Sequence, residues 1–206
     1  MKKLFLASAL ALFGAMNAQT EKGSWVVGGS TTLGFNSLKT EYKYDGDTED
    51  GPTVSTFALT PSVGYFVMDN LAIGLDLGFT SIKTKEESEG WNNETTASTL
   101  ALLPTATYYF KGSSNILPYL GAGVGYGSTN IKYKETYLGE SDSDEDSYGG
   151  LAYKAKGGIV FLLNSNVGLD LGLSYVATNG KLDSDNDVKV NSGGFGANVG
   201  FSVFFK

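Results

Sequence analysis

The chain offers few side chains for acid–base or metal chemistry, because it contains no histidine and no cysteine. Without cysteine there is no thiolate metal ligand, no disulfide and no lipid-bearing N-terminal thiol. Histidine is the side chain best suited to move protons near neutral pH, so its absence removes the usual catalytic base. The carboxylates show no spacing that supports a paired acid–base site. We therefore expect no catalytic residue, no cofactor and no resident metal, and a protein that is not an enzyme.

Two short acidic runs have the alternate spacing of calcium ligands. They are Asp45-x-Asp47-x-Glu49 and Asp183-x-Asp185-x-Asp187. Hard cations favour clustered oxygens, but neither run has the glycine and the distal glutamate of a helix–loop–helix calcium site. The simpler interpretation is a solvated, repulsive surface, and the alternative is divalent-cation bridging to lipopolysaccharide phosphates.

Four charged residues lie within otherwise alternating apolar segments: Asp76, Asp170, Lys154 and Lys156. In a strand each would share a face with small residues, away from the apolar side. Charges inside a narrow interior must be paired or hydrated. One interpretation is a gate or an ion-conducting constriction. We favour the other, a plug of paired charges that fills the interior, in which Lys154 or Lys156 pairs with Asp170 on the neighbouring strand.

The elements that position these charges are defined by an alternation of apolar and polar residues from Ser24 to Phe205. The segment from Pro118 to Gly127 shows it most clearly, with apolar side chains at the even positions and glycine or Tyr119 at the odd ones. Successive side chains of a strand point to opposite faces. One face is therefore apolar and the other nearly bare, as in a transmembrane barrel whose apolar face meets lipid.

The same pattern predicts eight strands. They cover approximately residues 24–35, 54–67, 71–82, 96–110, 118–127, 150–163, 167–177 and 193–205. Three short turns alternate with four long polar segments, at about residues 36–53, 83–95, 129–147 and 178–192. This predicts an all-β fold: an eight-stranded antiparallel transmembrane β-barrel built as an up-and-down meander. Pro61 and Pro104 fall inside strands on the outward parity, and each is expected to mark a bulge or a local bend.

The long segments are strongly acidic and should form loops outside the cell. They hold 18 of the 22 acidic residues and eight of the 15 lysines. The short turns and both termini should then face the periplasm. Aromatic residues gather near the expected strand ends, where the interfacial girdles of a barrel belong. They are Trp25, Tyr65, Tyr108 and Phe205 on the periplasmic side, and Phe35, Phe79, Tyr126, Tyr175 and Phe195 on the loop side.

Residues 1–18 are typical of a cleaved signal peptide. Lys2 and Lys3 precede an apolar run from Leu4 to Ala15, which is too short to span a bilayer. We expect cleavage after Ala18, with residues 19–206 forming one barrel domain. The chain has a formal net charge of −7 and no arginine, so a nucleic-acid partner is not expected.

With the strands laid out, the chain resembles the OmpX/OmpA-type eight-stranded outer-membrane barrels, especially the small outer-membrane β-barrel proteins common in Bacteroidetes-type bacteria. The resemblance covers the whole expected mature chain. The segments that carry it are residues 61–66, 71–78, 108–110, 118–127 and 200–205. The chain departs slightly from the usual aromatic C-terminus, because Lys206 follows Phe205. It is expected to lack the periplasmic domain of full OmpA-type proteins.

The resemblance implies an integral protein of the bacterial outer membrane, inserted by the barrel assembly machinery. We predict a non-enzymatic monomer with a structural and surface-interaction role through four acidic extracellular loops. Its expected partners are outer-membrane lipid and lipopolysaccharide. The alternative function is a narrow, porin-like pore for ions or small solutes, suggested by the interior charges and glycines.

Overall fold

The computed structural model describes residues 18–32, 36–44, 47–88, 90–112, 115–182 and 189–206, with only the backbone for residues 18, 31–32, 36–44, 47–50 and 182. The expected signal peptide, the acidic run at 183–187, Asp45 and Phe35 therefore lie outside the described residues or side chains. A short 3₁₀ turn, η1, covers Ala18–Thr20. No helix within these ranges is long and apolar enough to cross a membrane.

Nine strands make up one sheet. They are β1 (Trp25–Thr32), β2 (Asn36–Tyr44), β3 (Asp47–Met68), β4 (Leu71–Ser88), β5 (Trp91–Tyr109), β6 (Ile116–Tyr137), β7 (Glu140–Leu162), β8 (Val167–Leu182) and β9 (Lys189–Phe205). Every pairing is antiparallel, and β1 pairs with both β3 and β9, which closes the sheet. Because β1 and β2 both pair with β3, together they occupy the place of one barrel strand. The prediction of an eight-stranded antiparallel barrel is confirmed.

The alternation of side chains follows the predicted faces. Along β5, burial alternates residue by residue from Ala101 to Tyr109. Leu103 points inward and is 2% exposed, whereas its neighbour Leu102 points outward and is 49% exposed. The outward apolar side chains of β1 and β3–β9 form a belt that would meet lipid, as the sequence pattern indicates.

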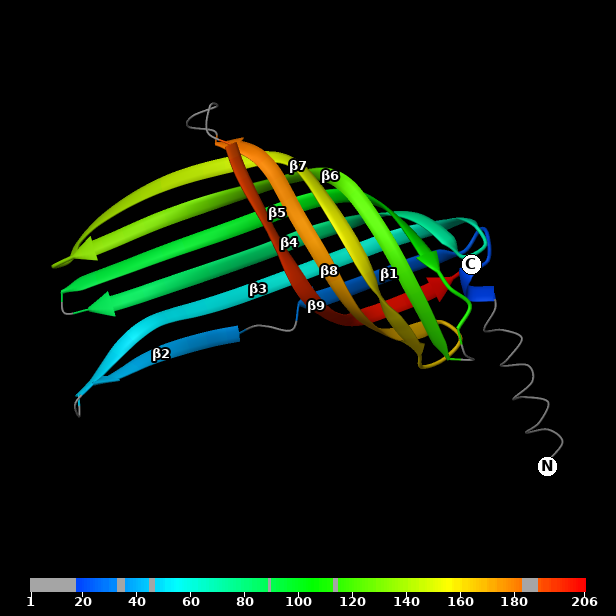
Figure 1. Ribbon diagram of the computed structural model, residues 1–206, viewed down its shortest axis with the longest axis horizontal. Helices are drawn as coiled ribbons and strands as arrows, with labels where there is room; N and C mark the ends of the chain where they lie inside the picture. The colour runs from blue at the N-terminus through cyan, green and yellow to red at the C-terminus, as the bar shows by residue number, and fades with distance from the viewer. Residues whose placement is uncertain (1–17, 33–35, 45–46, 89, 113–114, 183–188) are drawn as a thin grey trace.

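One end of the barrel is closed by tight turns. Asn70, in the turn between β3 and β4, has φ of 67°, a left-handed conformation that asparagine tolerates well. Between β7 and β8, the Asn164 side chain accepts hydrogen bonds from the backbone N–H of Asn166 and Val167 at 2.8 and 2.9 Å. The end of β9 and η1 lie at this same end (Figure 1). Two aromatic pairs lie beside these turns, Trp25 with Tyr65 and Tyr108 with Phe110, each with ring centroids 5.0 Å apart.

Three of the long polar segments are strands rather than loops, which corrects the predicted boundaries. β4 continues to Ser88 and β5 begins at Trp91, while β6 and β7 meet at a two-residue turn, Leu138–Gly139. Polar residues on both faces of these segments hide the amphipathic signal, but cross-strand pairing continues to the tips. The parts of β4–β7 at residues 82–88, 91–99, 129–137 and 140–148 form what we call the projecting sheet, which extends beyond β8 and β9 (Figure 1).

Neither proline introduces a bulge, which was one of the two features predicted at these positions. On both sides of Pro61 the register between β3 and β4 is the same, with Leu59 opposite Phe79 and Ser62 opposite Asp76. Pro104 likewise leaves the β5–β6 register unchanged. The missing N–H of each proline interrupts the ladder without shifting it.

Candidate functional site in the barrel lumen

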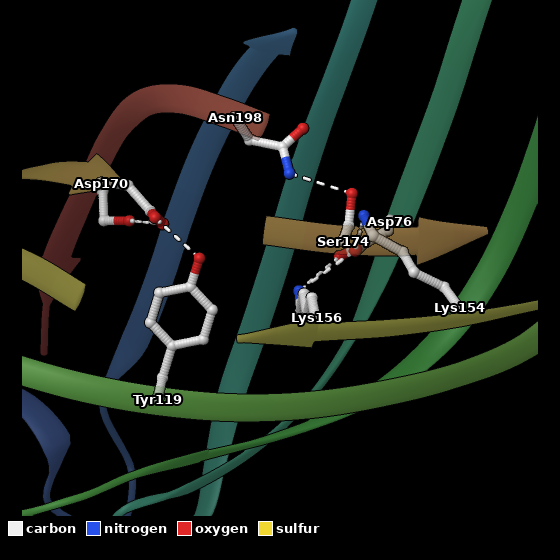
Figure 2. A network of polar contacts seen from close by, with 8 residues as sticks. Asp76, Tyr119, Lys154, Lys156, Asp170, Ser174 and Asn198 are labelled. Carbon is white, nitrogen blue, oxygen red and sulfur yellow. Dashed lines mark hydrogen bonds and ion pairs between the residues drawn. The ribbon is translucent and has the colours of Figure 1, made fainter. Parts of the chain in front are cut away.

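Two lysines converge on one buried aspartate in the lumen. Asp76 lies on β4 between outward-facing leucines and is 2% exposed. The Lys154 Nζ atom donates to Oδ2 of Asp76 at 2.8 Å, and the Lys156 Nζ atom donates to the same oxygen at 3.0 Å. Lys154 and Lys156 are two residues apart on β7, so both side chains point to the same face. Figure 2 shows them meeting Asp76 across the interior.

Asp170 does not pair with these lysines, which corrects the predicted partner. The β7–β8 register sets Asp170 opposite Val160, whereas Lys156 lies opposite Ser174. Instead, the Tyr119 hydroxyl donates to Oδ1 of Asp170 at 2.7 Å, as Figure 2 shows. The Ser202 hydroxyl makes a longer contact of 3.4 Å with Oδ2. The four predicted lumen charges therefore all face inward, but they form two separate groups.

An aromatic layer closes the lumen near the short turns. Phe66 and Phe204 are almost fully buried, and Tyr109 lies between them with ring centroids 5.5 and 5.9 Å away. Tyr119 extends the layer, 5.8 Å from Tyr109, and carries the hydroxyl that reaches Asp170. Phe204 was not predicted to face the lumen, although its position between outward Val203 and Phe205 was the available signal.

A small cavity of about 60 Å³ lies beside the charged groups. Its lining includes Asp76, both lysines, Asp170 and Tyr119. That volume has room for only a few water molecules. The inward glycines of β6 give space to side chains from other strands: a Cβ at Gly121 would come within 3.0 Å of Lys156 Cε and 2.8 Å of a threonine hydroxyl.

A second packed layer lies on the other side of the charges. Ala101, Leu103 and Ala152 form a buried apolar cluster. Nearby, the hydroxyls of Thr99 and Thr129 are hydrogen-bonded at 2.9 Å. The charged groups are thus held between two packed layers, with their polar atoms paired.

The paired charges are arranged to hold strands together rather than to carry out a reaction. The two aspartates and two lysines balance in charge, and each contacts another polar side chain. Within the part of the chain that the structure describes, no group of three acidic side chains is arranged to hold a metal ion. The site can therefore hold strands β4, β6, β7 and β8 together across the lumen.

The projecting sheet carries different charges on its two faces. On the outer face, which continues the lipid-facing side, Lys83 and Lys85 contact Glu94 at 2.5 and 3.6 Å. The hydrogen bond from Lys83 is the main cause that lowers the pKa of Glu94 below its usual value. On the same face, Lys132 lies 3.3 Å from Glu145, which Asn130 also contacts.

A closed antiparallel sheet with a lipid-facing apolar belt and a packed polar interior defines a transmembrane β-barrel. Residues 5–202 match the family model of the outer membrane protein beta-barrel domain. The chain belongs to this family and is a protein of the bacterial outer membrane. A search of curated proteins found no match.

Three solved structures have a similar course of the chain. Neisserial surface protein A is 18% identical, with 89% of this chain and 98% of that chain covered and a TM-score of 0.48. OprG from Pseudomonas aeruginosa is 16% identical, with 90% and 97% covered and a TM-score of 0.48. Ail, the attachment invasion locus protein of Yersinia pestis, is 21% identical, with 89% and 99% covered and a TM-score of 0.42.

Proposed function

We propose that this protein is a non-enzymatic barrel that anchors the projecting sheet at the cell surface, where the sheet contacts other molecules. The observation that carries the proposal is the continuation of β4–β7 beyond the lipid-facing belt. From Tyr126, an outward aromatic of that belt, β6 runs on to Tyr137. At about 3.4 Å per residue this is roughly 37 Å of strand, well beyond the interfacial region.

The filled lumen supports a structural role rather than transport. The aromatic layer of Phe66, Phe204, Tyr109 and Tyr119 lies across the interior, next to the paired charges of Asp76. An eight-stranded barrel is just wide enough for side chains to fill it. Opening a path would require separating a buried ion pair and displacing buried rings.

The proposal includes an orientation and a set of partners. The short turns and termini lie on the periplasmic side, and the projecting sheet lies outside the cell. The outer-face lysines, Lys83, Lys85, Lys132 and Lys134, lie four to eight residues beyond Phe79 and Tyr126 of the lipid-facing belt, and they contact lipopolysaccharide phosphates. The barrel acts as a monomer, is inserted by the barrel assembly machinery, and has no nucleic-acid partner.

The alternative function is a narrow pore. The cavity beside Asp76, Asp170 and the two lysines is the observation that favours it. Its volume of about 60 Å³ would have to extend through the aromatic layer before ions could pass.

The first test is conductance of the refolded full chain in a planar bilayer. We expect a silent membrane when folded insertion has been verified. Discrete current steps that change in Asp76→Asn would overturn the structural role and establish the pore.

The second test addresses the projecting sheet. Residues 131–146 are replaced by an Asn–Gly turn, and cells carrying either form are compared for adhesion to protein-coated surfaces. We expect the shortened barrel to fold and to lose adhesion. Equal adhesion of both forms would contradict the surface role, and an epitope inserted at Gly139 that antibodies cannot reach on whole cells would contradict the orientation.

A further inference from the structure

The inner face of the projecting sheet, which continues the lumen side, is acidic and aromatic. Strand parity is unbroken from the barrel to the tips of β4–β7. Its six carboxylates are Glu86, Glu135, Glu140, Asp142, Asp144 and Asp146, and its larger aromatic residues are Trp91, Tyr133, Tyr137 and Tyr148. Among the described residues of these four strands, no lysine lies on this face, whereas the outer face carries four lysines and three glutamates.

Several of these side chains are available for contact. Tyr137 is 60% exposed and Tyr133 is 43% exposed. Glu135, Glu140 and Asp142 are also exposed.

One cross-strand pair on this face opposes the stability of the sheet. Glu135 on β6 lies directly opposite Asp142 on β7, and like charges in that position are destabilising. The Trp91 indole N–H donates to Glu135 at 2.7 Å, which holds this carboxylate on the face. A bound cation between Glu135 and Asp142 would relieve their repulsion.

The spacing of the carboxylates selects an extended ligand. Along β7, Glu140, Asp142, Asp144 and Asp146 repeat every second residue, so they cover roughly 20 Å of strand at about 3.4 Å per residue. An extended peptide presents its own alternate side chains at the same spacing. Tyr133 lies opposite Asp144 and Tyr137 opposite Glu140, so an ammonium or guanidinium group there would meet a carboxylate and an aromatic ring together.

We propose that the inner face of the projecting sheet binds extended cationic peptide segments, with lysine or arginine at alternate positions. The proposal rests on the surface role proposed above and assigns that role a partner of defined chemistry. Charge complementarity carries it: among the described residues, the inner face has six carboxylates and no lysine, whereas the outer face is close to neutral, and the acidic face is the one that bears the exposed tyrosines.

The test uses the full chain refolded in lipid nanodiscs and a fluorescent octapeptide of alternating lysine and threonine. A peptide with glutamate in place of lysine is the ligand control. The inner-face variant is Asp142→Asn with Asp144→Asn. The matched control, Glu94→Gln with Glu145→Gln, makes the same change of net charge on the outer face.

We expect fluorescence anisotropy to show binding of the lysine peptide that weakens with salt. The inner-face variant should weaken binding about three- to tenfold, and the outer-face variant should leave it nearly unchanged. The inner-face variant should also raise the melting temperature, because it removes a like-charge pair. Loss of affinity would then not be a consequence of misfolding.

Three results would overturn the inference: equal binding of the glutamate peptide, equal weakening by both variants, or no lysine-peptide binding by a folded and electrically silent barrel. The last result leaves the surface role itself intact, because shortening the hairpin tests that role separately. Salt-sensitive dimerisation abolished by the inner-face variant, without peptide binding, would instead identify a second copy of this chain as the occupant.

Discussion

Removing the charge of Asp76 should destabilise the barrel more than removing the charge of Asp170. Asp76 is the acceptor for both Lys154 and Lys156, whose side chains are only 10% and 18% exposed. Asp76→Asn keeps the shape of the side chain but leaves two ammonium groups beside a neutral amide. Breaking a buried ion pair from one side typically costs about 3–5 kcal/mol. Asp170→Asn weakens hydrogen bonds from two hydroxyl groups and a longer-range attraction to the lysines, a cost of about 1–2 kcal/mol.

The assay is equilibrium unfolding by urea in lipid vesicles, followed by tryptophan fluorescence. The free energy of unfolding of Asp76→Asn is compared with that of Asp170→Asn. A third variant, Asp76→Leu with Lys154→Met and Lys156→Met, replaces the whole charged group by apolar side chains and should recover most of the lost stability. If Asp76→Asn lost no more than Asp170→Asn, the ion pairs would not be holding the strands together, and the reasoning would be refuted.

Three further outcomes follow from local geometry. Because the pKa of Glu94 is lowered when the protein folds, its small stabilising effect, under about 1 kcal/mol, is present near neutral pH and is lost as pH falls through that pKa. Comparing Glu94→Gln with the unmodified protein in acid and neutral melting curves checks this. Leu138 has φ of 47° at an exposed turn, so Leu138→Asn should raise stability by up to about 1 kcal/mol, and a lower melting temperature would contradict the strain argument. A Cβ at Gly125 would lie 2.0 Å from a backbone oxygen, so Gly125→Ala should cost about 1–3 kcal/mol, while Gly29→Ala, with open space around it, is the control in the same urea assay.

The faces of the strands could be predicted from the sequence because burial in a barrel depends only on parity. The leucines flanking Asp76 indicate that it points away from lipid, and the apolar residues Tyr153, Ile159 and Phe161 on the opposite face of the strand predict the same for Lys154 and Lys156. In the structure, these three charged side chains line the cavity in the lumen. Parity does not specify height across the lumen, which depends on strand stagger. For this reason the sequence could not predict that the lysines pair with Asp76 and not with Asp170.

The ends of the strands were harder to predict than their faces. Beyond Ile82, β4 has polar side chains on both sides, so the usual contrast between buried and solvated positions disappears. Beyond this point β4 is held in strand conformation by its pairing with β5. Pairing likewise extends β6 and β7 as far as the tight turn at Leu138. Leucine is an unusual residue at a tight turn, so the sequence carries no turn signal there. The polar composition of residues 129–147 favoured a loop.

The strand pair that closes the barrel joins β1, the first strand in the sequence, to β9, the last. Trp25, in the first strand, lies opposite Phe205, in the last, so nearly the whole chain separates the two residues that complete the ring. Until β9 arrives, β1 and β8 each present an unpaired backbone edge that hydrocarbon cannot satisfy. Barrel formation must therefore wait until β9 has been exported, and a chain truncated before β9 could not become a stable membrane protein. A single event, the pairing of β9 with β1, therefore separates an incomplete sheet from a closed barrel.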